Sequence, residues 1–150
     1  MSLQDELYKE TILDHYHCPR NHGVISGATL KQEGTNPLCG DELTLYIKLN
    51  NDTIEDIKIE AKGCSISMAS SSMMTEAIIG QKIKNAQIIA HNFKDMMLNK
   101  GNDYVFNETN EDLNSLNGVK KYPVRIKCAL LAWNTLLQSL EKDEAKAQGE

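Results

Sequence analysis

The sequence predicts an α+β fold in which an antiparallel hairpin lies between segments of helical periodicity. Apolar and polar side chains alternate along residues 43–49 and again along 57–61, which is typical of half-buried strands. The segments on either side carry apolar residues three or four positions apart, which indicates amphipathic helices. The chain has 150 residues, 41% of them hydrophobic and 25% charged, enough for one domain with a core. We therefore expect one domain over residues 1–150.

The first elements are a helix, a loop and the hairpin. A helix is expected over residues 2–17, with Ser2 as its N-cap. Residues 18–38 are rich in Gly, Pro and Asn, so we expect a loop with a short strand near residues 27–31. Turn-forming residues at 50–52 join the two hairpin strands. Both apolar sets share one face only if residue 43 lies opposite 61 and residue 45 opposite 59.

Three helices are expected after the hairpin. The first runs from Ser65 to Gly80, and the second runs from about Lys84 to Leu98 and ends before Gly101. Glycine is common at such helix ends. The third begins near Pro123, a residue suited to a first turn, and runs to about Leu140. Residues 101–118 are polar and rich in Asn, which predicts an ordered loop or an insertion within about residues 95–118. The charged residues 141–150 are expected to fray.

Cysteines stand at both ends of the hairpin, and an acid follows the first. Extending the register outward sets Asp41 against Gly63, with Cys64 one residue from the position opposite Cys39. Cys39 and Asp41 are two apart on one strand and project to the same side. Each thiol alone could be a small buried hydrophobe. Two thiols converging beside a carboxylate favour a metal or reactive site.

Cys128 is a third thiol, on the last expected helix. It falls off the apolar stripe of that helix, one or two turns from the N-terminus. Arg125 and Lys127 are nearby, and the helix N-terminus adds a partly positive field, so both effects are expected to stabilise a thiolate. Periodicity alone does not establish that Cys128 meets the end of the hairpin.

Composition also excludes some partners. The formal net charge is -5, and no basic stripe is available to neutralise nucleic-acid phosphates. No apolar run approaches 18 residues and no leader pattern opens the chain, so we expect a cytoplasmic protein with no membrane partner. In that reducing compartment, cysteines serve as ligands or nucleophiles more often than as disulfides. His15, His17, Cys18 and His22 lie close in sequence but are expected to be solvated or partly packed.

Three cysteine motifs occur in a particular order: Cys39-Gly40-Asp41, Gly63-Cys64-Ser65 and Arg125-Ile126-Lys127-Cys128. With "LYKETILDHYHCPRNHG" near the start and "CALLAWNTL" near the end, the chain resembles the SufU branch of the IscU-like (NifU N-terminal) iron-sulfur cluster assembly proteins. The scaffold branch has His where this chain has Lys127, and fewer residues between the last two cysteines. The resemblance implies a compact fold with a small antiparallel sheet of about three strands, covered by four to five helices.

The resemblance also implies a metal site made by Cys39, Asp41, Cys64 and Cys128. Three thiolates and a carboxylate suit tetrahedral Zn²⁺, which holds thiolates deprotonated at neutral pH. Iron and a transient [2Fe-2S] cluster are the alternative occupants.

The implied function is that of a zinc-dependent sulfur acceptor and carrier, a sulfurtransferase activity. Its partner is a pyridoxal-phosphate-dependent, SufS-like cysteine desulfurase, which provides a histidine to the zinc and so frees Cys39 to take the persulfide sulfur. Downstream iron-sulfur assembly machinery receives the sulfur. Arg125 is expected to contact the thiolate or the partner. Two alternatives are a scaffold for a [2Fe-2S] cluster and a zinc hydrolase, the latter without a convincing general base beyond Asp41.

Overall fold

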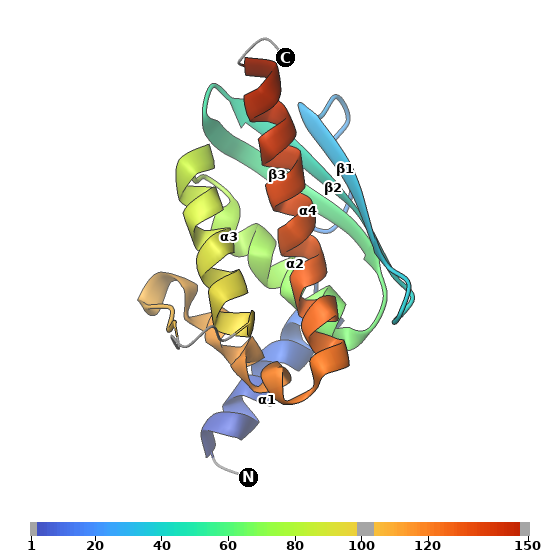
Figure 1. The fold of residues 1–150 in the computed structure, drawn as a ribbon, viewed down its shortest axis with the longest axis vertical. Helices are drawn as coiled ribbons and strands as arrows, with labels where there is room; N and C mark the ends of the chain where they lie inside the picture. The colour runs from blue at the N-terminus through green and yellow to red at the C-terminus, as the bar shows by residue number, and fades with distance from the viewer. Residues whose placement is uncertain (1–2, 99–103, 148–150) are drawn as a thin grey trace.

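The computed structural model describes residues 3–98 and 104–147. Within these residues a three-stranded antiparallel sheet in the order β1-β2-β3 is packed against helices, as expected for this α+β fold (Figure 1). Along the chain the elements are α1 (Leu3–His17), β1 (Leu30–Asn36), β2 (Asp41–Asn50), β3 (Thr53–Lys62), α2 (Ser65–Ile78), α3 (Ile83–Leu98), the 3₁₀ segment η1 (Glu108–Lys121) and α4 (Pro123–Ala147).

The hairpin of β2 and β3 has the register that the alternation predicts. Leu43 pairs with Ala61, and Leu45 pairs with Ile59. The register shifts between Lys48 and Leu49, close to the turn. This register places the N-terminal end of β2 beside the C-terminal end of β3, where the chain leaves the sheet for α2.

The third strand lies later in the chain than residues 27–31, where the sequence indicated it. β1 begins at Leu30 and runs through a polar sequence that only an edge strand accommodates. Gly34 is required there because a Cβ at this position would collide with the Thr135 side chain of α4. The helix therefore packs closely against β1, and this packing brings the start of α4 to the β1–β2 turn.

The core lies between the sheet and α4, which crosses one sheet face as the long red helix of Figure 1. Trp133 of α4 is fully buried and stacks on Phe93 of α3 with ring centroids 4.4 Å apart. Its indole N–H donates to Ser70 Oγ of α2 at 3.0 Å, so the large ring buries no unpaired donor. These interactions fix α2, α3 and α4 relative to one another.

Two helix ends differ from the expected ones. The N-cap of α2 is Cys64, not Ser65, because the Cys64 sulfur accepts the Ser67 N–H at 3.5 Å. The α4 helix continues past Leu140 to Ala147, where fraying was expected. Hydrogen bonds from Gln87 to Glu144 and from Lys142 to Gln32 hold this last part. Other expectations concern residues outside the described part of the chain. These are the N-cap at Ser2, the helix end before Gly101 and the fraying of residues 148–150.

From residue 108 onward, the Asn-rich stretch is a structured element. Residues 108–121 form η1, which buries Leu113, Leu116 and Val119 against the helices. The Asn114 side chain accepts the Phe106 N–H and donates to the Phe106 C=O, each at 2.8 Å. The Asn114 side chain thus satisfies both backbone groups of Phe106 and holds this polar stretch in one conformation.

The outer edge of β3 is covered by the chain that follows α1. Gly23 N–H donates to the Ile59 C=O and Ile59 N–H donates to the Asn21 C=O, each at 3.0 Å. This backbone pairing removes an open sheet edge. No helix among residues 3–98 and 104–147 is long and apolar enough to cross a membrane.

Candidate metal centre

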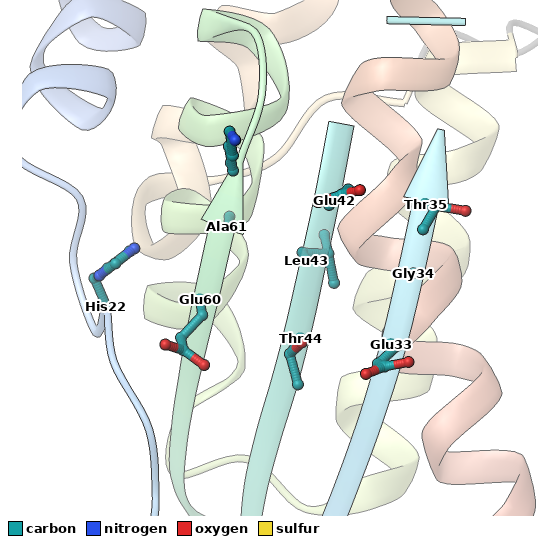
Figure 2. Close-up of a pocket in the computed structure, with 10 residues that line it drawn as sticks. His22, Glu33, Gly34, Thr35, Glu42, Leu43, Thr44, Glu60 and Ala61 are labelled. Atoms are coloured by element: carbon teal, nitrogen blue, oxygen red, sulfur yellow. The ribbon is translucent and has the colours of Figure 1, made fainter. Parts of the chain in front are cut away.

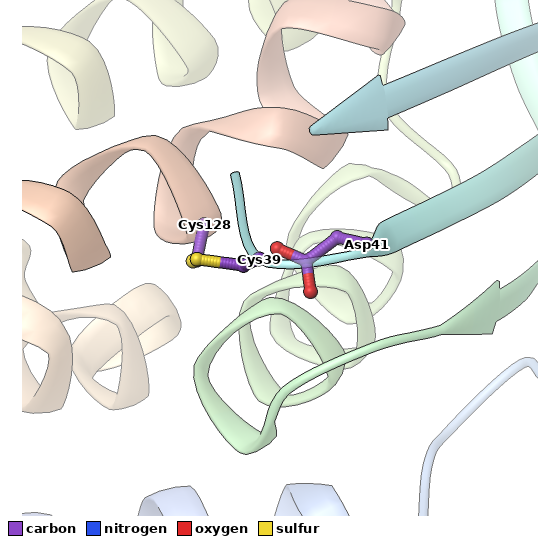
Figure 3. A group of neighbouring side chains, drawn as sticks. All are labelled: Cys39, Asp41 and Cys128. Atoms are coloured by element: carbon purple, nitrogen blue, oxygen red, sulfur yellow. The ribbon is translucent and has the colours of Figure 1, made fainter. Parts of the chain in front are cut away.

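Two thiols and a carboxylate meet where the β1–β2 turn approaches the first turns of α4 (Figure 3). The ligand atoms of Cys39, Asp41 and Cys128 all lie within 4.8 Å of one another. Cys39 sits in the turn, where its N–H donates to the Asn36 C=O at 3.2 Å and Gly40 adopts a φ of 68°. Because Cys39 is half-buried while Cys128 is fully buried, only one of the two thiols is open to solvent.

Asp41 is only 1% exposed, and hydrogen bonds hold its carboxylate from two sides. The Cys64 N–H donates to Asp41 Oδ1 at 2.9 Å, and the Asn36 side-chain amide donates to Oδ2 at 3.4 Å. Opposite this carboxylate lies Gly63, where an added Cβ would be 2.9 Å from Asp41 Cγ. The absence of a side chain at Gly63 therefore makes room for the carboxylate at this position.

Cys128 is 0% exposed although it lies outside the apolar stripe of its helix. Its thiol donates a hydrogen bond to the Cys39 sulfur at 2.9 Å and accepts one from the Asn36 side-chain amide at 3.6 Å. Burial in the metal-free protein raises the Cys128 pKa well above its ordinary range, with hydrogen bonds to Cys39, Cys64 and Asp41 acting in the same direction. Without a metal, desolvation thus outweighs the positive field expected from the helix and its basic neighbours.

Cys64 lies beside the group of Cys39, Asp41 and Cys128 but is not one of its members. Its backbone N–H binds Asp41, while its sulfur caps α2. Hydrogen bonding and charge also couple its thiol to Cys128. Of the four sequence-predicted residues, the structure therefore brings Cys39, Asp41 and Cys128 together, with Cys64 beside them and its sulfur engaged by a helix end.

Arg125, which the sequence analysis named, is exposed on the first turn of α4. The pKa of its guanidinium is raised by charge interaction and hydrogen bonding with Cys64, and to a lesser extent with Cys128. Lys127 is also exposed. A solvent-facing guanidinium beside two thiols can stabilise negative charge that develops on sulfur.

Sequence reasoning missed Asn36. It ends β1, is 6% exposed, and its amide reaches both Asp41 and Cys128. Its position three residues before Cys39 was the one hint in the sequence. That position indicates a role at the site only once β1 is known to end at Asn36. Gly63 was placed opposite Asp41, yet its need to be glycine emerges only from the structure.

A separate hollow of about 530 Å³ lies on the sheet near the loop that follows α1 (Figure 2). Its polar lining includes His22, Glu33, Glu42 and Glu60, and it contains none of the cysteines. Within the described part of the chain, these side chains do not converge as a metal-ligating group. Cys18 is exposed and belongs neither to the group of Cys39, Asp41 and Cys128 nor to the lining of the hollow. His15, which was expected to be solvated or partly packed, is buried.

Comparison with known proteins places this chain in a family. The family described as "NifU-like N terminal domain" matches residues 7–129. A relative from Bacillus subtilis, named zinc-dependent sulfurtransferase SufU, is 46% identical over 140 residues, which are 93% of each chain. A relative from Thermotoga maritima, named iron-sulfur cluster assembly scaffold protein IscU, is 36% identical over 91% of this chain and 94% of its own.

Solved structures agree with the sequence comparisons. The crystal structure of FiSufU from Fervidobacterium islandicum AW-1 superposes with a TM-score of 0.81 at 40% identity, covering 90% of this chain and 97% of its own. The N-terminal NifU-like protein of Brucella abortus gives 0.83 at 25% identity, covering 97% and 99%. On these matches, the chain belongs to the NifU-like N-terminal domain family and is related to the SufU and IscU proteins.

Proposed function

We propose that this protein is a zinc-dependent sulfur acceptor for iron-sulfur cluster assembly, with Cys39 as the accepting thiol. The observation that carries the proposal is the unequal exposure of two adjoining thiols. Cys39 is half-buried in a turn, while Cys128 and Asp41 are held in the interior behind it. A partner can therefore approach Cys39 without unfolding the groups that would hold the metal. The name of the Bacillus subtilis relative supports the same assignment.

The donor set is suited to Zn²⁺. Cys39, Asp41 and Cys128 provide two sulfurs and an oxygen, and Cys64 provides a third sulfur from the start of α2. The Cys39 and Cys128 sulfurs are 2.9 Å apart, closer than the roughly 3.8 Å between sulfurs of a tetrahedral zinc site, so zinc binding would separate them. When bound, zinc would keep these thiolates deprotonated at neutral pH.

The reaction is a persulfide exchange with a cysteine desulfurase. The Cys39 thiolate attacks the outer sulfur of the persulfide on the partner's cysteine, forming a new sulfur–sulfur bond as the partner's own bond breaks. The partner's cysteine leaves as a thiolate, so the negative charge passes from Cys39 to the partner. One persulfide and one thiol exchange places, so no external oxidant or reductant is required. Arg125, beside Cys64 and Cys128, would stabilise the negative sulfur during approach.

A scaffold function is the second candidate, because the Thermotoga maritima relative is named an IscU scaffold. The same thiols and carboxylate would then hold a [2Fe-2S] cluster during assembly. Anaerobic metal analysis of the freshly purified protein separates the two. The acceptor proposal expects about one zinc per chain at this centre, because the three thiols and Asp41 make one four-donor shell. Iron with visible sulfur-to-iron charge-transfer absorption, and no zinc, would favour the scaffold.

The decisive experiment locates the transferred sulfur. After incubation with a cysteine desulfurase and free cysteine, mass spectrometry should find the additional sulfur on Cys39. Cys39→Ser should abolish acceptance, because a serine hydroxyl provides almost no anion at neutral pH. Cys18→Ser is the matched control, since Cys18 is exposed and distant from the ligand group, and it should behave as the parent. Additional sulfur on Cys128, with Cys39→Ser still active, would contradict the acceptor assignment.

A further inference from the structure

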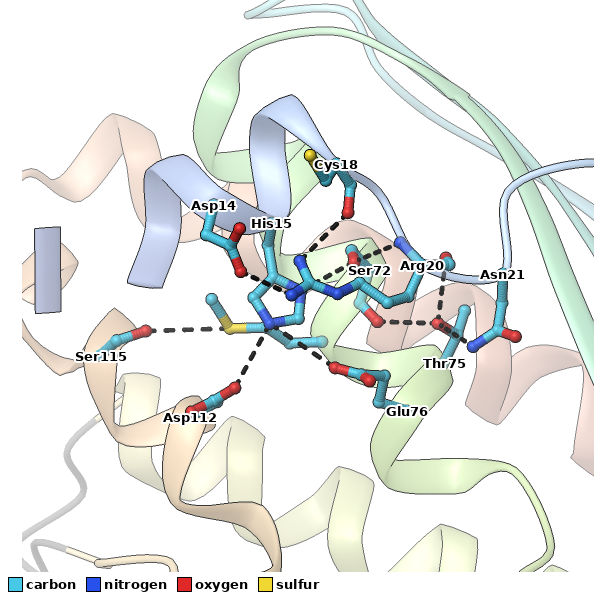
Figure 4. Close-up of polar contacts among 11 residues, drawn as sticks. Asp14, His15, Cys18, Arg20, Asn21, Ser72, Thr75, Glu76, Asp112 and Ser115 are labelled. Atoms are coloured by element: carbon cyan, nitrogen blue, oxygen red, sulfur yellow. Dashed lines mark hydrogen bonds and ion pairs between the residues drawn. The ribbon is translucent and has the colours of Figure 1, made fainter. Parts of the chain in front are cut away.

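A second group of metal-ligating side chains lies away from the thiols, where α1, α2 and η1 meet (Figure 4). Its centre is His15, which is 1% exposed. The His15 Nε2 atom is 3.3 Å from Asp112 Oδ2 of η1 and 3.6 Å from Glu76 Oε1 of α2. The three ligand atoms all lie within 4.8 Å of one another. One nitrogen and two carboxylate oxygens thus converge from three separate elements.

The separations match those between neighbouring ligands of one ion. Metal bonds to imidazole nitrogen and carboxylate oxygen are roughly 2.0–2.2 Å long, so adjacent ligands lie about 3.0–3.5 Å apart in octahedral or tetrahedral shells. The two distances from His15 Nε2, 3.3 and 3.6 Å, fall in or next to this range. An ion could therefore be seated by small rotations of the Glu76 and Asp112 side chains, without movement of the backbone.

The other ring nitrogen of His15 is positioned as a metal-bound histidine requires. Nδ1 lies 2.7 Å from Ser72 Oγ, which also accepts the Arg20 N–H at 2.8 Å. A hydroxyl oxygen has two acceptor lone pairs, so Ser72 can accept from Nδ1–H as well. With Nδ1–H donated to Ser72, the Nε2 lone pair would be free to face the two carboxylates, as in metal sites where an outer-shell partner holds the other ring nitrogen.

The charges near His15 also favour a cation. Glu76 and Asp112 bring two carboxylates to one point. The neighbouring cation is Arg20, whose guanidinium is bound to the Asp14 carboxylate and the Cys18 carbonyl. Arg20 also attracts Glu76 electrostatically, so it offsets part of the negative charge. A divalent ion would balance both carboxylates.

Solvent reaches this group through a cavity of about 390 Å³ that is lined by Glu76, Thr109, Asn110 and Asp112. The side chains of Glu76 and Asp112 are 48% and 62% exposed, leaving room for an ion to enter with part of its water. We propose that His15, Glu76 and Asp112 form a second, thiol-free site for a divalent first-row transition-metal ion. A mixed imidazole and carboxylate shell is suited to such ions, with water in the remaining positions.

Occupancy would connect η1 to the rest of the protein. Asp112 is the ligand from η1, while His15 and Glu76 belong to helices that pack against each other. The ion would thus tie η1 to the α1–α2 pair and stabilise the folded state by binding it preferentially. Its role is structural, separate from the sulfur chemistry of Cys39.

Mn²⁺ is the probe of choice, because it prefers oxygen and nitrogen over thiolate ligands. The full chain is first given one equivalent of Zn²⁺, which the thiols take preferentially, and Mn²⁺ is then titrated while electron paramagnetic resonance measures free Mn²⁺. We expect one bound Mn²⁺ per chain. Glu76→Gln and Asp112→Asn should each weaken binding by about tenfold or more. Both side chains are substantially exposed, so the fold should tolerate these changes.

Glu111→Gln is the matched control for diffuse attraction. It removes one negative charge from the same cavity wall but no member of the ligand group, so Mn²⁺ affinity should stay at the parent value. His15→Gln should abolish binding, with circular dichroism checking that this buried substitution still folds. Absence of stoichiometric Mn²⁺ binding, or equal weakening in Glu111→Gln and Asp112→Asn, would overturn the proposal. Neither result depends on sulfur transfer, so this test can fail independently of the proposed function.

Discussion

Gly63→Ala should destabilise the protein at the candidate metal centre while changing no metal ligand. The new Cβ would lie 2.9 Å from Asp41 Cγ, 3.0 Å from Asp41 Cα, and closer still to Oδ1. Because the α-carbon of Asp41 is part of the backbone, rotating the carboxylate relieves only part of the clash. The displaced Oδ1 would lose the Cys64 N–H, now at 2.9 Å.

The expected size follows from that hydrogen bond. Losing a hydrogen bond to a charged group costs about 1.5–3 kcal/mol. For a chain of this length, each kcal/mol lowers the melting temperature by about 2–4 °C, so the midpoint should fall by roughly 3–12 °C. Thermal unfolding of the metal-free protein, followed by circular dichroism under reducing conditions, measures this shift. Zinc affinity, measured by competition with a chromophoric chelator, should fall as well because Asp41 is displaced.

Gly118→Ala is the matched control, since Gly118 is exposed in η1 and a Cβ there would meet nothing within 4 Å. The Asp41→Ala background provides a second check. Without the carboxylate, only the clash with the backbone of residue 41 remains, so Gly63→Ala should cost less there than in the parent. If Gly63→Ala melts and binds zinc like Gly118→Ala, then Asp41 is not held against Gly63, and the reasoning about this centre is wrong.

Three further outcomes are expected at the same centre. Asp41→Ala should keep the fold but exchange zinc faster, because a coordination position opens; unchanged zinc retention and unchanged desulfurase activation would mean that Asp41 is no ligand. Chelation of the zinc-loaded protein should lower its melting temperature, because the donors come from separate elements; a melt insensitive to chelator would argue against this. Metal-free protein should lose stability as pH rises above about 8.5, since Cys128 ionises there only when unfolded. Cys128→Ala should flatten that pH dependence, and an equally steep loss in this variant would assign it to another group.

The hairpin end of the site could be predicted from sequence because strand alternation constrains both faces at once. Placing Leu43 against Ala61 leaves no freedom in where Asp41 and Gly63 lie, and the observed register agrees. The position of Cys128 could not be obtained in this way. Helical periodicity describes only the face that α4 turns to the main core, whereas Cys128 is covered by the β1–β2 turn, a segment distant in sequence.

Strand β1 illustrates a second limit. Its sequence is polar from Lys31 to Asn36 and includes Gly34, so it carries no alternation that sequence analysis detects. It is a strand because its backbone pairs with β2 and its glycine lets the Thr135 side chain of α4 approach closely. In η1, likewise, the Asn114 side chain satisfies the Phe106 backbone, an arrangement that composition does not reveal. Tertiary interactions decide both elements, which is why their local sequences did not indicate them.

The sulfur cap of α2 gives the centre a built-in reporter. The Ser67 amide proton points at the Cys64 sulfur, so its electronic environment depends on whether that sulfur is a thiol, a free thiolate or a metal ligand. A thiolate accepts a hydrogen bond more strongly than a thiol does, and a sulfur shared with a metal has less charge to offer. The Ser67 amide resonance in a nitrogen-15 correlation spectrum would therefore follow the chemical state of Cys64 directly, with no label introduced at the cysteines.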